Sequence, residues 1–245
     1  MGEILSVHLP NLLVGQYPNG PLGGLALTLI LSVLGLGLAF PISIALALCR
    51  LSSHAVLRVP STVIVYVVRG VPLVMLVFWS YFLVPGLTGH SVSAFTTLVV
   101  TLVIYQAAYM SEIVRAGIEA LPRGQTEAAR SLGMSHGLTM RQVILPQALF
   151  NMLPSLISQF VSTIKETSIG YVISVQELTY SANQVNAALL TKPFEVFVVL
   201  ALIYFAVCYL LTQCALFVDR HITRRRAGTP TATRGPKNDL LLQGE

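Results

Sequence analysis

Four ionisable side chains lie inside apolar stretches of the chain, where a charge needs a partner or a polar cavity. Arg69 follows "VIVYVV", Glu112 follows "QAAYMS", and Lys165 and Glu166 are neighbours in "VSTIKETSI". A charge at the centre of a bilayer helix costs about 2.5–3.5 kcal/mol on insertion scales. These side chains should therefore face a path for a polar solute or pair with one another.

The spacing favours different roles for different members of this set. Glu112 and Arg115 are three residues apart on an expected helix, so they are well placed to form a structural ion pair. Arg69 lies about twelve residues beyond Leu57, or roughly 18 Å at 1.5 Å per residue, which puts it near the middle of a membrane. For Arg69 and the Lys165–Glu166 pair we favour a solute path.

The segments that contain these residues have the composition and length of membrane helices. The chain has 245 residues, of which 54% are hydrophobic and only 10% are charged, whereas soluble domains carry about 25% charged residues. A spanning helix needs about 20 mostly apolar residues. We therefore expect an all-α integral membrane protein of about five transmembrane helices, at about 22–49, 57–85, 92–118, 143–175 and 194–218.

Loop charges predict the orientation. Arginines flank the first and third loops and follow the last span, whereas "PGLTGHS" has no Lys or Arg and the fourth loop has only Lys192. The positive-inside rule then places the N-terminus outside and the C-terminus in the cytoplasm. We expect an extracytoplasmic segment 1–21, a transmembrane domain 22–218 with a cytoplasmic loop of about 119–146, and a polar, disordered cytoplasmic tail 219–245.

Few motifs point to chemistry carried out by this chain itself. "GMSHG" fits a hydrolase nucleophile elbow around Ser135, but no strand is expected before it, so we interpret the match as a coincidence. The sequence has no glycine-rich phosphate loop, and its basic residues are not clustered with aromatics as in nucleic-acid binding proteins. The histidines lack metal-ligand spacing: His8, His54, His90, His136 and His221.

The loop "TEAARSLGMSHGLTMRQVILPQ", residues 126–147, mixes charged residues with alanine and glycine. We expect a helix over 125–132 that ends at Gly133 as a C-cap, and a second helix that begins after Ser135 as N-cap. Such a helix pair is either a surface connector or a shape that docks in a partner's groove. One face of the first helix is expected to gather Ala128, Ala129 and Leu132, with Glu127 and Arg130 beside it.

This loop resembles the EAA loop of permease subunits of bacterial ATP-binding-cassette importers. Glu127, Ala128, Ala129, Gly133, Leu145 and Pro146 match that pattern, and Val143 stands where the pattern has Ile. The resemblance extends through "RGVPLVMLVFWSYFLVPG", "AAYMSEIVRAGIEALPRGQTEAARSLG" and "IKETSIGYVISVQELT", and it covers nearly all of residues 20–220. These segments look like the branch of the family that takes up polar amino acids.

The resemblance implies a type I importer permease fold in the bacterial inner membrane and several partners. They are a second permease subunit, a periplasmic substrate-binding protein, and two cytoplasmic ATPase subunits that bind ATP and Mg. This chain would hold no cofactor and catalyse no reaction. Its contact with the ATPase would be made by Glu127, Ala128, Ala129, Leu132 and Gly133.

An amino-acid substrate also suggests roles for the intramembrane residues. A guanidinium holds a carboxylate through two hydrogen bonds, so Arg69 is the candidate ligand of the α-carboxylate, with Lys165 as a second cation. Glu166 is the candidate ligand of the ammonium group, with the Thr167 and Ser168 hydroxyls beside it. Glu112 completes the expected substrate-binding set.

The sequence leaves two questions open, namely which amino acid is the substrate and which energy source drives its transport. The segment "PLVMLVFWSYFLVPG" most resembles glutamate/aspartate permeases, and the two cations Arg69 and Lys165 suit an acidic amino acid. Glu112 and Glu166 would equally suit a basic amino acid. The main alternative function is a secondary carrier driven by an ion gradient, in which the Lys165–Glu166 pair would relay ions. The sequence has no evident inverted repeat, which disfavours a carrier of that kind.

Overall fold

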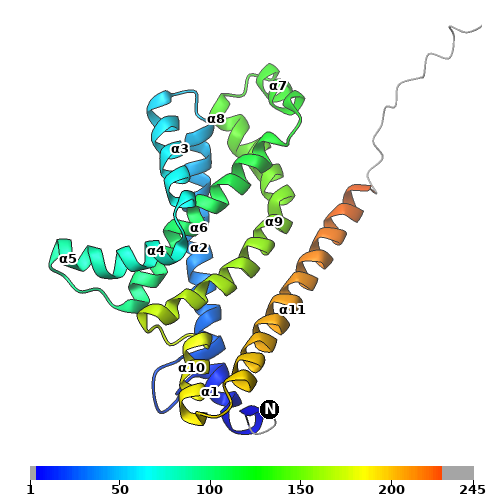
Figure 1. The fold of residues 1–245 in the computed structure, drawn as a ribbon. Coiled ribbons are helices and arrows are strands. Elements are labelled where there is room, and N and C mark those ends of the chain that lie inside the picture. Colours follow the sequence, from blue (N-terminus) through cyan, green and yellow to red (C-terminus); the bar gives the residue numbers. More distant parts are fainter. Residues whose placement is uncertain (1–3, 228–245) are drawn as a thin grey trace, which may run out of the picture.

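The structure, a computed structural model, describes residues 4–227, and all the regular elements among them are helical (Figure 1). The all-α prediction is confirmed. Of the expected polar tail 219–245, residues 219–227 belong to the last helix, α11. Residues 228–245 lie outside the described residues. The α-helices are α1 (Leu9–Val14), α2 (Gly24–Leu51), α3 (Ala55–Gly70), α4 (Leu73–Phe78), α5 (Val84–Thr88), α6 (Ala94–Glu119), α7 (Arg123–Ser131), α8 (His136–Thr139), α9 (Leu145–Glu166), α10 (Leu178–Leu189) and α11 (Pro193–Ala227).

Four short segments with other helical hydrogen bonding complete the chain. Three are π-helical: η1 (Ile4–His8), η2 (Trp79–Leu83), which joins α4 to α5, and η3 (Met140–Ile144), which joins α8 to α9. The fourth, η4 (Thr167–Ile173), extends α9 as a 3₁₀ helix.

Within residues 4–227, four helical segments are long and apolar enough to cross a membrane. They are Gly24–Leu51, Ala94–Glu119, His136–Ile173 and Pro193–Phe217. The remaining expected span, 57–85, is a pair of helices, because α3 and the α4–α5 segment are bent by 101° at their junction. Residues 4–227 thus contain four continuous candidate spans, or five if the bent pair is counted as one span, in agreement with the expected number of about five.

The break in the second span follows from Pro72. A proline disfavours the helical conformation of the residue before it, and Val71 is extended, with φ −104° and ψ 134°. The proline also has no N–H for a hydrogen bond to the preceding turn. Figure 1 shows that α4 and α5 consequently leave α3 sideways and that α5 projects away from the bundle.

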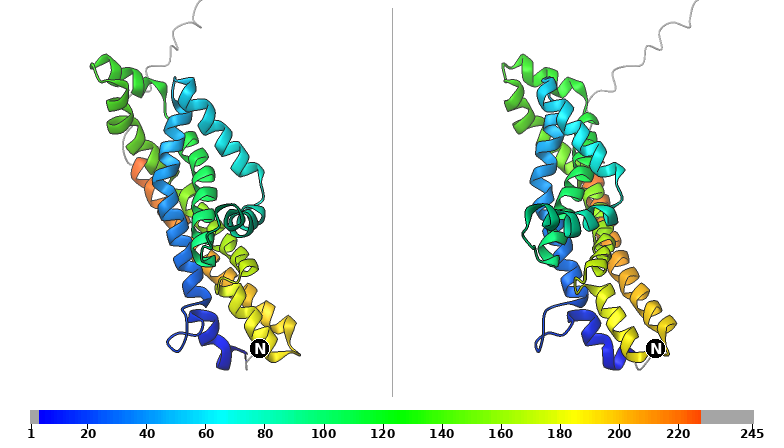
Figure 2. Two further views of the ribbon diagram at one scale, coloured as in Figure 1. Left: turned by 90° about the vertical axis from the view of Figure 1, so that its left-hand side faces the viewer. Right: turned by 60° about the vertical axis from the view of Figure 1, so that its left-hand side comes forward.

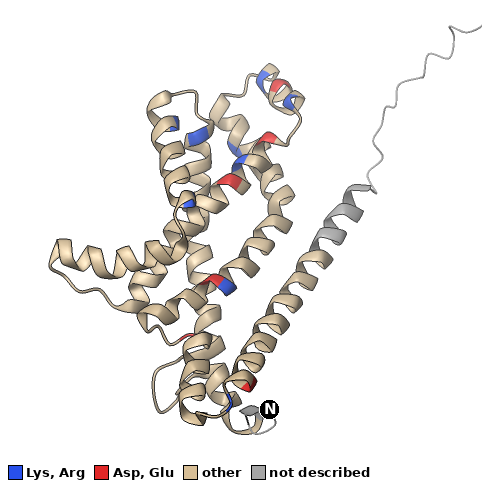
Figure 3. Ribbon diagram, viewed as in Figure 1, with Lys and Arg blue, Asp and Glu red and all other residues tan. Residues whose placement is uncertain are grey.

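The molecule is elongated, and its two ends differ (Figure 2). One end is built by α1 and α10, whose residues Leu12 and Leu178 are buried in one cluster with Val196 of α11. The opposite end carries α7, α8 and the turn between α2 and α3. Most of the Lys and Arg residues drawn in Figure 3 gather at this second end.

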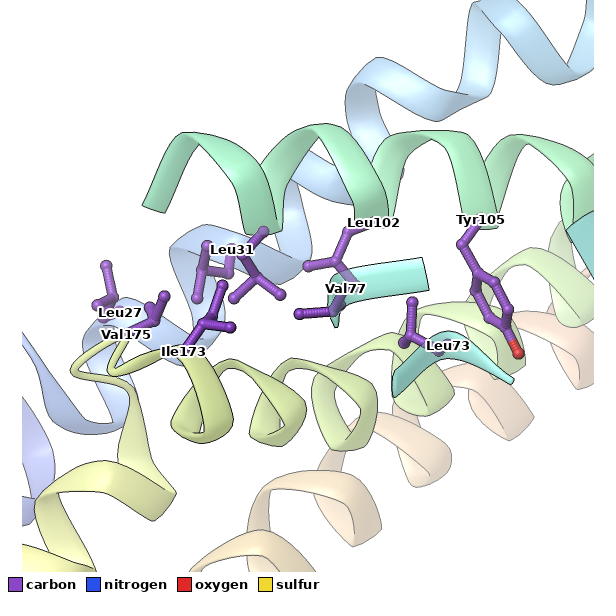
Figure 4. Packing of buried hydrophobic residues seen from close by; sticks show 9 residues of the cluster. Leu27, Leu31, Leu73, Val77, Leu102, Tyr105, Ile173 and Val175 are labelled. Carbon is purple, nitrogen blue, oxygen red and sulfur yellow. The ribbon is translucent and has the colours of Figure 1, made fainter. Parts of the chain in front are cut away.

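The core lies where α2 and α6 run side by side. Helices in membranes approach closely at small residues, and Gly35 of α2 fits this rule, because a Cβ placed there would lie 3.3 Å from Leu102 Cβ. Figure 4 shows Leu31, Leu102 and Val77 in this cluster, together with Ile173 at the end of η4. The core thereby fixes α4, α6 and the α9–η4 helix relative to α2, and these elements carry or border the charged residues.

Candidate functional site

Glu112 of α6 is the centre of a charged cluster. Arg50 Nη1, from the last turn of α2, lies 2.6 Å from Glu112 Oε2. Arg69 Nη1, from the end of α3, lies 3.6 Å from the same oxygen. Arg115 donates to the other oxygen, which confirms the expected pair within the helix. Three helices therefore meet at one carboxylate, and Arg50 was not anticipated from the sequence.

Beside this cluster lies a cavity of about 390 Å³ between α6, α9 and the end of α3. It brings together two of the expected substrate-binding residues, Arg69 and Glu112. The Arg69 guanidinium also lies over the Tyr109 ring, 5.1 Å from its centroid, in a cation–π arrangement. The polar residues that line the cavity are Arg69, Tyr109, Glu112, Asn151, Ser155 and Gln159.

Glu166 is connected to the cavity through two amide side chains. Gln159, which lines the cavity, donates from Nε2 to Gln106 Oε1 at 2.7 Å. Gln106 is fully buried and donates in turn to Glu166 Oε2. The sequence reasoning missed both glutamines, although each is a polar residue within a long apolar helix and buried polar groups are nearly always hydrogen-bonded.

The remaining expected ligands do not line this cavity. Lys165 is exposed on the helix surface next to Glu166. The Thr167 hydroxyl donates to the Ile164 carbonyl at 2.8 Å, and the Ser168 hydroxyl donates to the Lys165 carbonyl at 2.7 Å. Both hydroxyl protons are thus bound within the helix itself in this conformation, and the substrate roles of these residues stay predictions.

The loop between α6 and α9 has the expected helices and caps. The first helix, α7, is followed by Gly133 at φ 83°, a left-handed conformation that glycine adopts without strain. The Ser135 hydroxyl accepts from Leu138 N at 3.3 Å and caps α8. The serine therefore precedes a helix and follows another, which is not the strand–serine–helix geometry of a hydrolase elbow.

The exposed face of α7 differs from the expected one at Ala129. Leu132 is 84% exposed, and Glu127 and Ala128 are exposed as well. Ala129, in contrast, is buried within the chain. With 3.6 residues per turn, neighbouring positions point about 100° apart, so the side of α7 that faces η3 takes Ala129 and the outer side takes Ala128. The exposed face of α7 therefore carries Glu127, Ala128 and Leu132.

No group of three or more His, Cys, Asp or Glu side chains in the described part of the chain could hold a metal ion. The fold is a bundle of membrane-spanning helices, with a cavity between them that has charged and polar residues in its lining, and a helical loop at one end. This is the architecture of a solute-transporting membrane component. Residues 37–224 match the family described as binding-protein-dependent transport system inner membrane component, and the chain belongs to this family.

Several curated relatives are similar to most of the chain. The inner membrane amino-acid ABC transporter permease protein YhdY of Escherichia coli (strain K12) is 36% identical over 83% of this chain, which spans 57% of that longer relative. The probable glutamine ABC transporter permease protein GlnP of Bacillus subtilis (strain 168) is 34% identical, and the match covers 78% of this chain and 88% of that protein.

A solved structure agrees with these sequence relatives. The crystal structure of an amino acid ABC transporter with histidines contains a chain that is 36% identical, with a TM-score of 0.75. The match covers 80% of this chain and 92% of that one. Sequence and fold therefore point to the same family over the same part of the chain.

Proposed function

We propose that this chain forms the translocation path of an ATP-driven importer of polar amino acids and transmits force from a separate ATPase. The observation that carries the proposal is the cavity lined by Arg69 and Glu112 inside a bundle whose relatives are amino-acid ABC permeases. Charged side chains at membrane depth that face a cavity are typical of a substrate path. The family membership favours this function over a secondary carrier.

The charge balance around the cavity supports an acidic substrate. Glu112 is already bound by Arg50 and Arg115, so its negative charge is occupied. Arg69 has the longest contact with Glu112, at 3.6 Å, and its side chain is 34% exposed. Arg69 is therefore the cation available to a substrate carboxylate, which it can hold through two hydrogen bonds.

The ammonium group of the substrate would be bound further along the path, at Glu166. The Gln159–Gln106–Glu166 chain supports this order, because it leads from the cavity to that carboxylate. Lys165, Thr167 and Ser168 would contact the substrate only after the α9–η4 junction has rearranged. Each hydroxyl would then exchange its bond to the helix backbone for one to the substrate.

Force would enter through the exposed face of α7 and Gly133 behind it. Glu127, Ala128 and Leu132 would contact one of two ATPase subunits, which bind ATP and Mg and carry out the hydrolysis. Since α8 continues through η3 into α9, a displacement of the loop would reach Gln159 and Glu166 along one helix. A second permease subunit and a periplasmic binding protein would complete the importer.

The gathering of Lys and Arg at the α7–α8 end supports a cytoplasmic position for that end. The N-terminal segment and α10 then face the periplasm. In this orientation the expected extracytoplasmic segment 1–21, which includes η1 and α1, would lie on that outer side.

Uptake measurements in proteoliposomes test this function directly. The chain is reconstituted with its ATPase and binding protein, and entry of labelled glutamate is followed with ATP inside the vesicles. We expect uptake that depends on internal ATP and persists when an ionophore collapses the ion gradients. Uptake that stops with the ionophore at constant ATP would identify a secondary carrier instead.

A further inference from the structure

A second cavity, separate from the one at Arg69, lies between the C-terminal end of α2 and the α8–η3 helix. Its volume is about 420 Å³. Its lining includes the apolar residues Leu48, Leu51 and Leu145 and the polar residues Ser52, His136 and Arg141. We call it the α2–η3 groove, and its combination of leucine side chains with an arginine suits an amphiphile with an anionic headgroup.

The positive charge of Arg141 is available to a ligand. The ion pairs found among the described residues that involve Arg50, Arg69 and Arg115 all use Glu112 or Glu119. None of the ion pairs in that part of the chain includes Arg141, which is exposed at the edge of the groove. An anionic group placed there would gain a charge-assisted hydrogen bond.

The apolar lining of the groove adjoins exposed apolar residues of α2. Leu38 and Ile42 of α2 are exposed large apolar residues, and Ala45 is exposed on the same side. These positions and Leu48, which lines the groove, follow one another at intervals of four, three and three residues, so they form one stripe along the helix. An acyl chain could therefore run along α2 while its headgroup occupies the groove.

We propose that the α2–η3 groove binds an anionic phospholipid, with the phosphate at Arg141 and the proximal part of an acyl chain against Leu48, Leu51 and Leu145. The groove lies at the end of two spanning segments, Gly24–Leu51 and His136–Ile173, where headgroups of a leaflet meet protein. Basic pockets between transmembrane helices at the cytoplasmic surface bind such headgroups. The assignment of this lipid to the cytoplasmic leaflet rests on the orientation proposed above. The presence of the binding site does not depend on that orientation.

Native mass spectrometry of the full chain, released from vesicles of equal parts phosphatidylglycerol and phosphatidylcholine, tests the proposal. Both leaflets contain both lipids, so the result does not depend on orientation. We expect retained phosphatidylglycerol to exceed phosphatidylcholine by about fivefold, the effect of one basic residue near an anionic headgroup. Equal retention of the two lipids by the unsubstituted chain would overturn the proposal.

Two substitutions locate the site, and one serves as a control. Arg141→Gln should remove the preference, whereas Arg58→Gln, at another exposed arginine near the same end of the molecule, should keep it. Gly137→Trp should displace the lipid by filling the groove, because no atom lies within 4 Å of a Cβ built at Gly137. A preference that survives Arg141→Gln and Gly137→Trp alike means that the lipid binds elsewhere.

A soluble competitor separates a lipid from a free anion. Glycerol 3-phosphate carries the headgroup phosphate without acyl chains, so it should displace little phosphatidylglycerol at equal concentration. Complete displacement would identify a site for small phosphates and contradict the lipid assignment. If the two groove substitutions leave the lipid preference intact but release a co-purified ATPase, the groove is part of the ATPase dock and the proposal fails.

Discussion

The Arg50 guanidinium and the Glu112 carboxylate join residues that are 62 positions apart, at 2.6 Å. The Arg50 side chain is only 6% exposed, so this ion pair is largely removed from solvent. It ties the end of α2 to the middle of α6, beside the cavity that Arg69 lines. This pair determines how much of the Glu112 charge remains for a substrate.

Replacement of Arg50 by Gln should destabilise the chain. Glu112 would lose the guanidinium that contacts its Oε2 at 2.6 Å, and the loss of one partner of a buried hydrogen bond costs about 1–3 kcal/mol. The thermal unfolding of the detergent-solubilised chain measures the effect. Arg58→Gln is the control, because Arg58 is exposed. Identical melting temperatures for the Arg50 variant and the unsubstituted chain would mean that Arg69 and Arg115 alone neutralise Glu112.

Replacement of Arg69 by Ala should abolish amino-acid uptake while the ATPase subunits still co-purify. The substituted cavity keeps Glu112 bound by Arg50 and Arg115 but loses the cation available to the substrate carboxylate. Arg69→Lys should retain part of the uptake with a raised KM, because an ammonium cannot reproduce the two-bond geometry of a guanidinium.

Arg58 offers a matched control for the Arg69 experiment, since both arginines belong to α3. Arg58→Ala should transport normally. If Arg69→Ala also transports with an unchanged KM, Arg69 is a structural charge and the substrate path lies elsewhere.

Substitutions on α7 should separate coupling from folding. Glu127→Lys should leave the subunit in the membrane but uncouple ATP hydrolysis from uptake, because it reverses a charge on the exposed face of α7 that we propose contacts the ATPase. Ala128→Asp should have the same effect without changing stability, whereas Ala129→Asp should lower the melting temperature, since Ala129 is buried. ATPase activity and uptake are measured in the same vesicles. Normally coupled uptake in the Glu127 and Ala128 variants would contradict the assigned docking face.

Glu177, between the third and fourth continuous spans, should make stability depend on pH. It is fully buried at the start of α10 and accepts from Thr179 N at 2.8 Å, Tyr180 N at 2.9 Å and the Tyr204 hydroxyl at 3.2 Å. Burial nevertheless dominates and raises the pKa of this carboxyl from 4.5 to about 7.

The sign follows from this raised pKa. The folded chain favours protonated Glu177, so the stabilising contribution is complete below pH 4.5 and is lost as the pH rises through about 7. The loss is on the order of 3 kcal/mol at 1.36 kcal/mol per pKa unit. The melting temperature should fall between pH 5 and 8, and Glu177→Gln should reduce this fall. A fall of equal size in the Gln variant would assign it to other groups.

Features that depend on neighbouring residues could be predicted from the sequence. Gly133 and Ser135 gave the end of α7 and the start of α8, because caps are local. The Glu112–Arg115 pair is also local, since it lies within one helical turn. The proline that breaks the second span was visible, but the apolar length of 57–85 favoured a single span.

Features that depend on helix packing could not be predicted in this way. The choice between Arg50 and Arg69 as the closer partner of Glu112 depends on how α2 and α3 lie against α6. The burial of Gln106 and its bond to Glu166 likewise arise from the contact of α6 with α9. Whether a side chain on a short amphipathic helix is buried also depends on the element that packs against it. Ala129 of α7, which is buried on the side that faces η3, is an example.

The unbroken helical run from α8 to η4 has a mechanical consequence. This segment, His136–Ile173, contains 38 residues, so its contour is roughly 57 Å at 1.5 Å per residue. If the segment rotates as a rigid body about its η4 end, a tilt of about 5° moves its loop end, at His136, by roughly 5 Å. A pivot at the loop end would carry Glu166, thirty residues away, by roughly 4 Å. A small rotation of this segment thus displaces the Glu166 carboxylate by more than the length of a hydrogen bond. Such a displacement is large enough to make or break its contact with an amino group.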